Sequence, residues 1–114
     1  MTAFRVLLVL ILAVLVFYTG IVIANHGIGL LPIFFGDMLQ MGWPGQFNLD
    51  FMFMLTLSAL WTAWRHRFSG TGFVLACLAL FGGSLFLATY LLMLSWQTKG
   101  DIKRVLLGDA RADR

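Results

Sequence analysis

The sequence contains no glutamate, a single cysteine, and no lysine or arginine between Arg5 and Arg65. Only 11% of the residues are charged, whereas an ordinary soluble domain is about 25% charged. The hydrophobic share is 61% and the mean hydropathy is +0.91. A soluble core of this size could not hide so much apolar surface. The composition therefore predicts one small domain surrounded by a lipid bilayer.

The scarcity of charge and cysteine also excludes several classes of function. The lysines and arginines are few and scattered, so they form no clustered basic face for nucleic acid. Cys77 has no second cysteine for an intrachain disulfide or a metal cluster. The two histidines, His26 and His66, fall at opposite ends of the predicted bundle, so one chain cannot use both to ligate a haem iron. No spacing typical of a zinc site, a dinucleotide fingerprint or a phosphate loop is present, and we expect no metal and no cofactor.

Three hydrophobic stretches predict three transmembrane helices, at about 5–25, 46–66 and 72–96. A cleaved signal peptide is the alternative for the first stretch, but its apolar run is long for one, so we favour a retained helix. The purely apolar part of the second stretch would cover only ~21 Å at the helical rise, whereas the hydrocarbon core is ~30 Å thick. We therefore expect this helix to begin near Gln46 and to draw Asn48 and Asp50 toward the lipid.

Shorter elements are expected between and after these spans. The linker, residues 26–45, should hold a short helix with Pro32 in its first turn, lying in the membrane interface or dipping partway into it. The hairpin after the second span offers Ser69 or Thr71 as an N-cap for the third helix. The tail, residues 97–114, predicts a short amphipathic interfacial helix followed by a disordered end.

A chain with three spans places the hairpin and the tail on opposite sides of the membrane. The linker carries no cation and the hairpin carries Arg65 and Arg67, so the positive-inside rule favours a cytoplasmic N-terminus and hairpin, with linker and tail outside. The cation count of the tail slightly favours the opposite orientation. A fourth span through the linker would put both termini inside, but it would have to bury Pro32, Asp37 and Gln40.

The third span carries small residues at helical spacing along one face. They are Gly72, Ala76, Ala79 and Gly83. Membrane helices associate through close packing of such residues, so this face predicts a helix-packing interface, either inside a three-helix bundle or between subunits. Three thin helices leave much side-chain surface uncovered, and the expected partners are the lipid bilayer, a second copy in a homo-oligomer, or a larger membrane complex.

Polar residues around the linker form a candidate ligand-binding pocket. His26 ends the first helix and Asp50 begins the second, and antiparallel neighbours would bring both to one membrane face, where an ionisable group is a functional candidate. The candidate pocket consists of Asn25, His26, Asp37, Gln46, Asn48 and Asp50. The alternative is structural: Asn48 caps the second helix, Asp50 interacts favourably with its dipole, and His26 faces water.

Arg65 and Arg67 form a basic hairpin that we expect to contact anionic lipid head groups, at roughly 1 kcal/mol per cation. The surrounding pattern also carries a family resemblance. Residues 45–51 read GQFNLDF, and a short span then ends in WRHR at 64–67. With these motifs the chain resembles small three-helix bacterial inner-membrane proteins of uncharacterised function. The resemblance implies a three-helix protein of the bacterial inner membrane and transfers no activity or site.

Together these patterns favour a small integral membrane protein that is not an enzyme. It would act as an accessory or assembly subunit, or as a self-associating helix bundle that binds lipid or partner helices. One alternative is an oligomeric transporter or channel-like protein with a polar path at His26 and Asp50. A second alternative is a membrane enzyme acting on a lipophilic substrate, with Asp50 as its acid or base.

Overall fold

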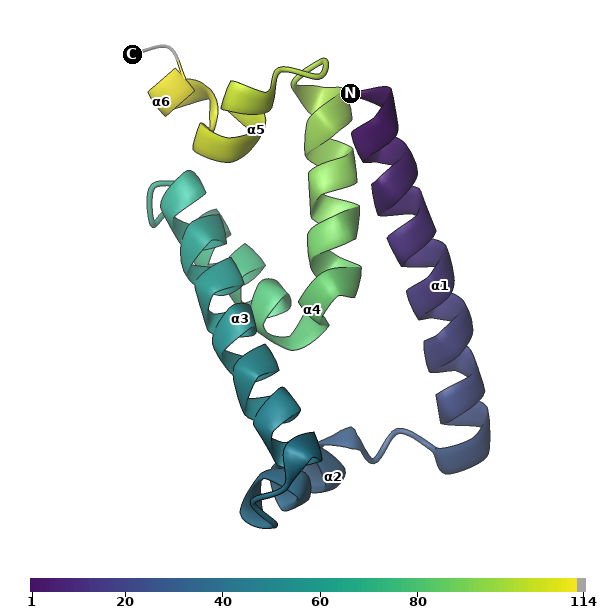
Figure 1. The fold of residues 1–114 in the computed structure, drawn as a ribbon. Helices are drawn as coiled ribbons and strands as arrows, with labels where there is room; N and C mark the ends of the chain where they lie inside the picture. The colour runs from purple at the N-terminus through teal and green to yellow at the C-terminus, as the bar shows by residue number, and fades with distance from the viewer. Residues whose placement is uncertain (113–114) are drawn as a thin grey trace.

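The computed structural model describes residues 1–112, which fold into six helices and contain no strand (Figure 1). In chain order the helices are α1 (Thr2–His26), α2 (Leu30–Leu39), α3 (Trp43–Arg65), α4 (Gly70–Gln97), α5 (Ile102–Leu107) and α6 (Asp109–Ala112). The predicted all-α class is confirmed. The predicted disordered end falls partly on α6, which is helical, and partly on residues 113–114, which lie outside the described part of the chain.

Two helices, α1 and α4, are long and apolar enough to cross a membrane by length and composition. α1 has 25 residues, which corresponds to ~38 Å at the helical rise. It ends at Gly27, whose φ of 76° is easily reached only by glycine. α3 has 23 residues but is less apolar, because its first turns hold Gln46, Asn48 and Asp50. The structure thus shows two candidate spans and a third long helix.

α4 consists of two helical arms joined by a sharp bend (Figure 1). The bend lies at Gly83, whose φ of 57° and ψ of −140° are not helical and favour glycine. The first arm, residues 70–82, runs antiparallel to α3, because Gly72 lies against Ala63 and Gly83 lies against Phe51. Each arm is only ~20 Å long at the helical rise, so neither arm alone matches the ~30 Å of a hydrocarbon core.

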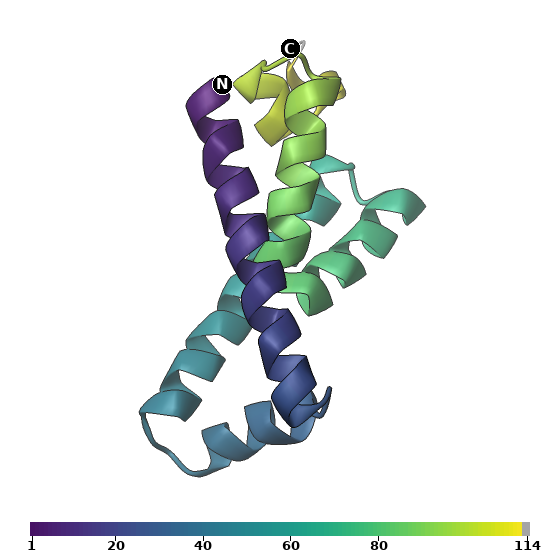
Figure 2. The same cartoon turned by 90° about the vertical axis from the view of Figure 1, so that its right-hand side faces the viewer.

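The second arm of α4, residues 84–97, returns to the end from which the first arm started (Figure 2). Its Tyr90 is hydrogen-bonded to His66, and its Ser95 accepts a 2.9 Å hydrogen bond from Arg5 Nε near the start of α1. The N-terminus, the α3–α4 hairpin and the tail therefore lie together. We name this the cationic end, because it holds all seven lysines and arginines of residues 1–112: Arg5, Arg65, Arg67, Lys99, Lys103, Arg104 and Arg111.

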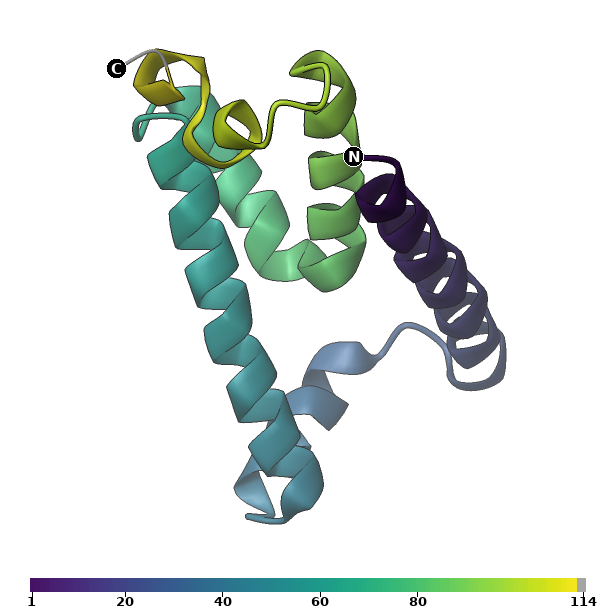
Figure 3. The same cartoon turned by 45° about the horizontal axis from the view of Figure 1, so that its top comes forward.

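The structure differs here from the predicted straight third span with a tail on the far side of the membrane. The apolar pattern continues through the break, but Gly83 reverses the direction of the chain. α5 and α6 then fold back over the ends of α3 and α4 (Figure 3). Trp61 Nε1 donates a 3.1 Å hydrogen bond to the Leu106 carbonyl, and Arg111 donates to the Trp64 carbonyl. The tail therefore packs against the end of α3.

The buried core is small and is centred at the cationic end. The buried apolar residues are Leu8, Ala63, Ala79, Ala88, Tyr90, Leu94 and Val105. Tyr90, Leu94 and Val105 form one cluster, which joins the second arm of α4 to α5. Val105 is 0% exposed although α5 has only six residues. Full burial of such a side chain contributes about 1.5–3 kcal/mol, which holds the tail in place.

At the opposite end of the molecule, α2 packs against the first turns of α3. α3 begins at Trp43, earlier than the predicted start near Gln46. Gly45 is buried because the backbone of α2 approaches it closely: an added Cβ would lie 2.4 Å from the Asp37 carbonyl oxygen. Asn48 consequently lies inside α3, and its side chain donates a 3.0 Å hydrogen bond to a carbonyl of α2. It ties the two helices together and does not cap α3.

Candidate functional site at the cationic end

The structure does not bring the residues of the predicted ligand pocket together. His26 and Asp50 are both exposed, and within residues 1–112 no hydrogen bond or ion pair joins them. α1 packs against α4, whereas the start of α3 packs against α2, so the end of α1 lies apart from the start of α3 (Figures 1 and 3). Asn25 and Gln46 are also exposed, and Asp37 is half-buried. α1 and α3 follow one another among the long helices but are not neighbours, because the second arm of α4 stands between them.

The predicted small-residue face of α4 lies largely against the same chain. Gly72 and Ala79 are buried, and Ala76 is half-buried. A Cβ added at Gly83 would lie 2.9 Å from the Phe51 ring of α3. α3 therefore occupies part of this face, and Gly83 also forms the bend.

An apolar groove of about 540 Å³ lies between α2, α3 and the bend of α4. Five of its eleven lining residues are phenylalanines, so we name it the phenylalanine groove; they are Phe34, Phe35, Phe47, Phe51 and Phe81. Asn48 is its single polar lining residue, and its amide is already used in the hydrogen bond to α2. The groove suits a hydrocarbon chain and offers little to orient a polar ligand.

A hydrogen-bonded cluster of Arg65, His66 and Tyr90 lies at the cationic end. Arg65 is the last residue of α3, His66 is its C-cap, and Tyr90 belongs to the second arm of α4. Arg65 Nη1 donates to the Tyr90 hydroxyl oxygen over 3.3 Å, and the same hydroxyl is hydrogen-bonded to His66 Nε2. Arg65 can only donate, and the Tyr90 hydroxyl oxygen can accept this bond while its own proton goes to His66 Nε2. In that arrangement the proton of a neutral imidazole lies on Nδ1; in the other tautomer Nε2 donates to the same oxygen.

His66 is held in this neutral form by its surroundings. Partial burial lowers the pKa of His66 from its ordinary value of 6.5, and the adjacent Arg65 cation lowers it further. At neutral pH the imidazole is therefore predominantly uncharged, with one ring nitrogen as a donor and the other as an acceptor. Nδ1 has no hydrogen-bond partner within residues 1–112.

Arg65 also binds the tail through its backbone. Its Nε donates a 2.7 Å hydrogen bond to the Val105 carbonyl, and Nη2 donates a 3.0 Å hydrogen bond to the Arg104 carbonyl. Both carbonyls belong to the last turn of α5, where a positive charge is favourable. The Arg104 carbonyl also accepts a 2.9 Å hydrogen bond from the Gly108 amide, so Arg65 adds a second donor there. The sequence predicts that Arg65 contacts lipid head groups; in the structure its side chain forms three hydrogen bonds within the protein and also lines a cavity. Arg67 is exposed at the surface of the hairpin.

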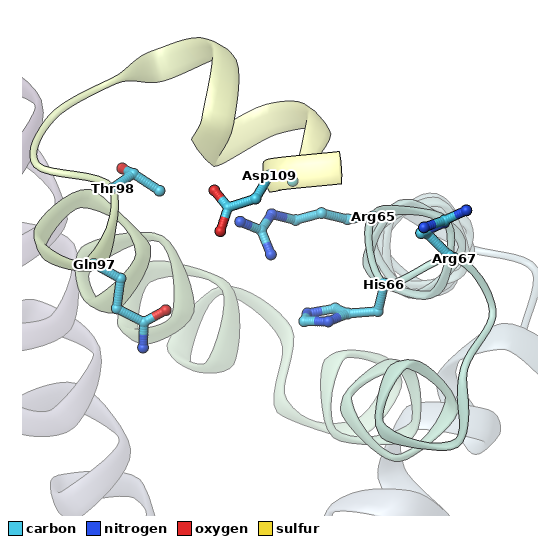
Figure 4. A pocket seen from close by; sticks show the side chains of 7 residues that line it. Arg65, His66, Arg67, Gln97, Thr98 and Asp109 are labelled. Atoms are coloured by element: carbon cyan, nitrogen blue, oxygen red, sulfur yellow. The ribbon is translucent and has the colours of Figure 1, made fainter. Parts of the chain in front are cut away.

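A polar cavity of about 390 Å³ opens beside this cluster, between the ends of α3 and α4 and the tail (Figure 4). Its lining residues are Arg65, His66, Arg67, Gln97, Thr98, Gly108 and Asp109. Figure 4 shows Arg65, His66 and Asp109 pointing into the space, with Gln97 opposite them and Arg67 turned away at the rim. Three of the five guanidinium N–H groups of Arg65 are used within the protein, which leaves two for a ligand.

Tyr90 is a residue of this candidate site that sequence reasoning missed, and Gln97 and Asp109 are two others. In the sequence, Tyr90 stands out as a tyrosine within an apolar stretch, and a buried tyrosine hydroxyl usually needs a hydrogen-bond partner. The partner could not be identified from the sequence, since it depends on the reversal at Gly83.

Comparison with protein-family models, curated proteins and solved structures finds no match for this chain.

Proposed function

We propose that this protein is a non-enzymatic accessory protein of the bacterial inner membrane that binds a transmembrane helix of a partner along α1. The observation that carries the proposal is the exposure of α1. Leu8 is its single buried residue within the described chain, and only 6% of its most apolar window is buried. Within the described residues α1 packs mainly against α4, so its other faces must be covered by lipid or by another helix.

The distribution of charge supports insertion in the membrane with the cationic end in the cytoplasm. All seven described lysines and arginines lie at that end, whereas the opposite end carries Asp37 and Asp50. Cytoplasmic segments of membrane proteins are enriched in lysine and arginine. In this arrangement α1 and α3 cross the bilayer, and α4 enters and leaves it on the cytoplasmic side.

A small residue on the open part of α1 favours a helix as the partner. A Cβ added at Gly20 would meet nothing within 4 Å, so this glycine is not used for packing within residues 1–112. Ala24 follows one turn later and is exposed as well. Small residues at this spacing let two membrane helices approach closely. The rival channel-like function has less support, because His26 and Asp50 lie on separate elements and face no common path.

Purification in a mild detergent tests the proposal. We expect a second polypeptide, or a second copy of this chain, to remain bound to the full-length protein. Gly20→Leu should remove it, because the added side chain blocks close approach. Ala3→Leu is the matched control, since it adds a similar volume at an exposed position on another face of α1. A monomer with no bound polypeptide, or equal loss in both variants, would contradict partner binding at Gly20.

A further inference from the structure

A second cavity continues from the polar cavity toward the bend of α4. It has a volume of about 380 Å³ and lies between the two arms, with Leu75 and Leu78 on the first arm and Phe86 and Met93 on the second. We name it the inter-arm cavity. Arg65, His66 and Gln97 line both cavities, so the polar one and the apolar one meet at these side chains.

The groups that face the polar cavity are suited to an anion. Arg65 retains two N–H groups after its three bonds within the protein, and His66 Nδ1 carries a further N–H when the Tyr90 hydroxyl donates to Nε2. The side-chain amide of Gln97 makes no hydrogen bond within residues 1–112 and supplies a further N–H donor. Asp109 is the one acid in the lining, and it forms an ion pair with Arg104 over 3.3 Å. A singly charged oxyanion would therefore find several donors and one opposing carboxylate.

The shape of the combined space selects among anions. A free phosphate ion would occupy only the polar cavity and would leave the apolar inter-arm cavity uncovered. A phospholipid joins a phosphate to an acyl chain, so it fills both parts. Because the cationic end lies at a membrane face in the proposed orientation, such a lipid is available from the adjacent leaflet.

We propose that the cavity enclosed by α3, the two arms of α4 and the tail binds one anionic phospholipid, with its phosphate beside Arg65, His66 and Gln97 and an acyl chain between the arms. This inference rests on the membrane insertion proposed above and is independent of partner binding at Gly20. The lipid would brace the bend of α4, because it contacts both arms at their open end.

Native mass spectrometry of the full-length protein in detergent tests this site, with phosphatidylglycerol as the probe. We expect one phosphatidylglycerol per chain, retained more strongly than phosphatidylcholine and not displaced by inorganic phosphate. Equal retention of the two lipids, or displacement by phosphate at millimolar concentration, overturns the proposal. The Gly20→Leu variant should keep this lipid whether or not a partner polypeptide is lost, so the two proposals can fail separately.

A gain of affinity provides a test that damage to the fold cannot imitate. Asp109→Asn removes the opposing carboxylate and should tighten phosphatidylglycerol binding about threefold. Asp101→Asn is the matched control: it removes a carboxylate at the same end, outside the cavity, and asparagine still caps α5. Equal tightening in both variants would show a general surface-charge effect and would refute a defined site.

Two further variants examine the two halves of the site. Gln97→Leu removes an amide donor and should weaken binding about fivefold. Met93→Trp fills the inter-arm cavity and should weaken it about tenfold, whereas Val74→Trp, at an exposed position outside the lining, should leave it unchanged. Unchanged retention in Met93→Trp would exclude an acyl chain between the arms.

Discussion

Arg65 Nε donates a 2.7 Å hydrogen bond to the carbonyl of Val105, forty residues later in the chain. This bond joins the end of α3 to the last turn of α5, and the same arginine holds Tyr90 of α4. One side chain therefore connects three helices and closes the tail over the small core. The cost of ordering a short tail is offset here by charge-assisted hydrogen bonds and by the burial of Val105.

Replacing Arg65 should release the tail while leaving the long helices folded. Arg65→Gln removes the charged donors to both α5 carbonyls and should lower the free energy of tail opening by on the order of 3 kcal/mol. Hydrogen–deuterium exchange of the α5 amides measures this opening. Arg67→Gln is the control, because Arg67 is exposed in the same hairpin. Unchanged protection of α5 in Arg65→Gln would show that Val105 burial alone holds the tail.

Replacing Gly83 should destabilise the bend of α4. Alanine at a φ of 57° and ψ of −140° is strained, and its Cβ would lie 2.9 Å from the Phe51 ring. We expect Gly83→Ala to reduce the free energy of unfolding by about 1–3 kcal/mol, as measured by chemical denaturation in detergent. Gly70→Ala should change it by less than about 0.5 kcal/mol, because a Cβ there meets nothing within 4 Å. Equal stability of the two variants would contradict the bend.

The same glycine should control where the tail lies. In a Cys77→Ala background, Arg67→Cys and Lys99→Cys should react with a membrane-impermeant maleimide from the same side, because both positions flank the returning α4. Adding Gly83→Ala should move part of the Lys99→Cys population to the other side, since a straight α4 of 28 residues is ~42 Å long. If the two cysteines reacted from opposite sides in the protein that keeps Gly83, the result would support the straight transmembrane span predicted from the sequence.

The sequence was sufficient for the local elements of the fold. A run of apolar residues predicts α1, and Ser69 accepts a 3.1 Å hydrogen bond from Gly72 N, as expected of an N-cap for α4. These features depend on neighbours within a few residues. A helix of apolar residues follows from composition, and a cap follows from one side chain close to the first turn.

The arrangement of the helices could not be predicted in the same way. Gly83 serves both close helix packing and a break: a Cβ there would meet the Phe51 ring of α3, and its φ of 57° interrupts α4. The small-residue spacing predicts the packing, whereas nothing in the sequence pattern predicts the break. The pocket at His26 and Asp50 was inferred by treating consecutive long helices as neighbours. Both errors concern long-range contacts, which leave no periodic signal in a single sequence.

The stability of the cationic end should fall in mild acid because of His66. Its pKa in the folded protein is below the ordinary value of 6.5, so the unfolded chain takes up a proton first as the pH falls. Stability is therefore fully present above about pH 6.5 and is lost as the pH falls from there through the lowered folded-state pKa. Protonation also makes both ring nitrogens donors, so Nε2 can no longer accept a hydrogen bond from the Tyr90 hydroxyl.

Melting temperatures between about pH 7.5 and about pH 5 measure this dependence, in a range where carboxylates remain mostly ionised. We expect the melting temperature to decrease across this range in the native sequence and in His26→Gln. His66→Gln should be less stable at neutral pH and should show a flatter profile. A profile that stays unchanged in His66→Gln would assign the pH dependence to another group.

Gly45, where α2 packs against α3, gives the sharpest steric prediction, because the atoms that approach it belong to the backbone of α2 and not to a side chain. An added Cβ would lie 2.4 Å from the Asp37 carbonyl oxygen and 2.8 Å from the Met38 Cα, and neither atom can turn away as a side chain would. Gly45→Ala should therefore force α2 off α3 and cost about 1–3 kcal/mol. Gly36→Ala, within α2 itself, is the control, since a Cβ there meets nothing within 4 Å.

Separation of the two helices would also change the phenylalanine groove, because α2 supplies one of its walls. The Asn48 amide would lose its 3.0 Å hydrogen bond to the Phe34 carbonyl, and α2 amides should exchange faster in Gly45→Ala than in Gly36→Ala. The cationic end lies at the other end of the molecule, so α5 protection and phosphatidylglycerol retention should stay unchanged. If Gly45→Ala instead lowered the exchange protection of both α2 and α5, the fold would be one cooperative unit. A local steric change would then spread along α3 to the Arg65 contacts.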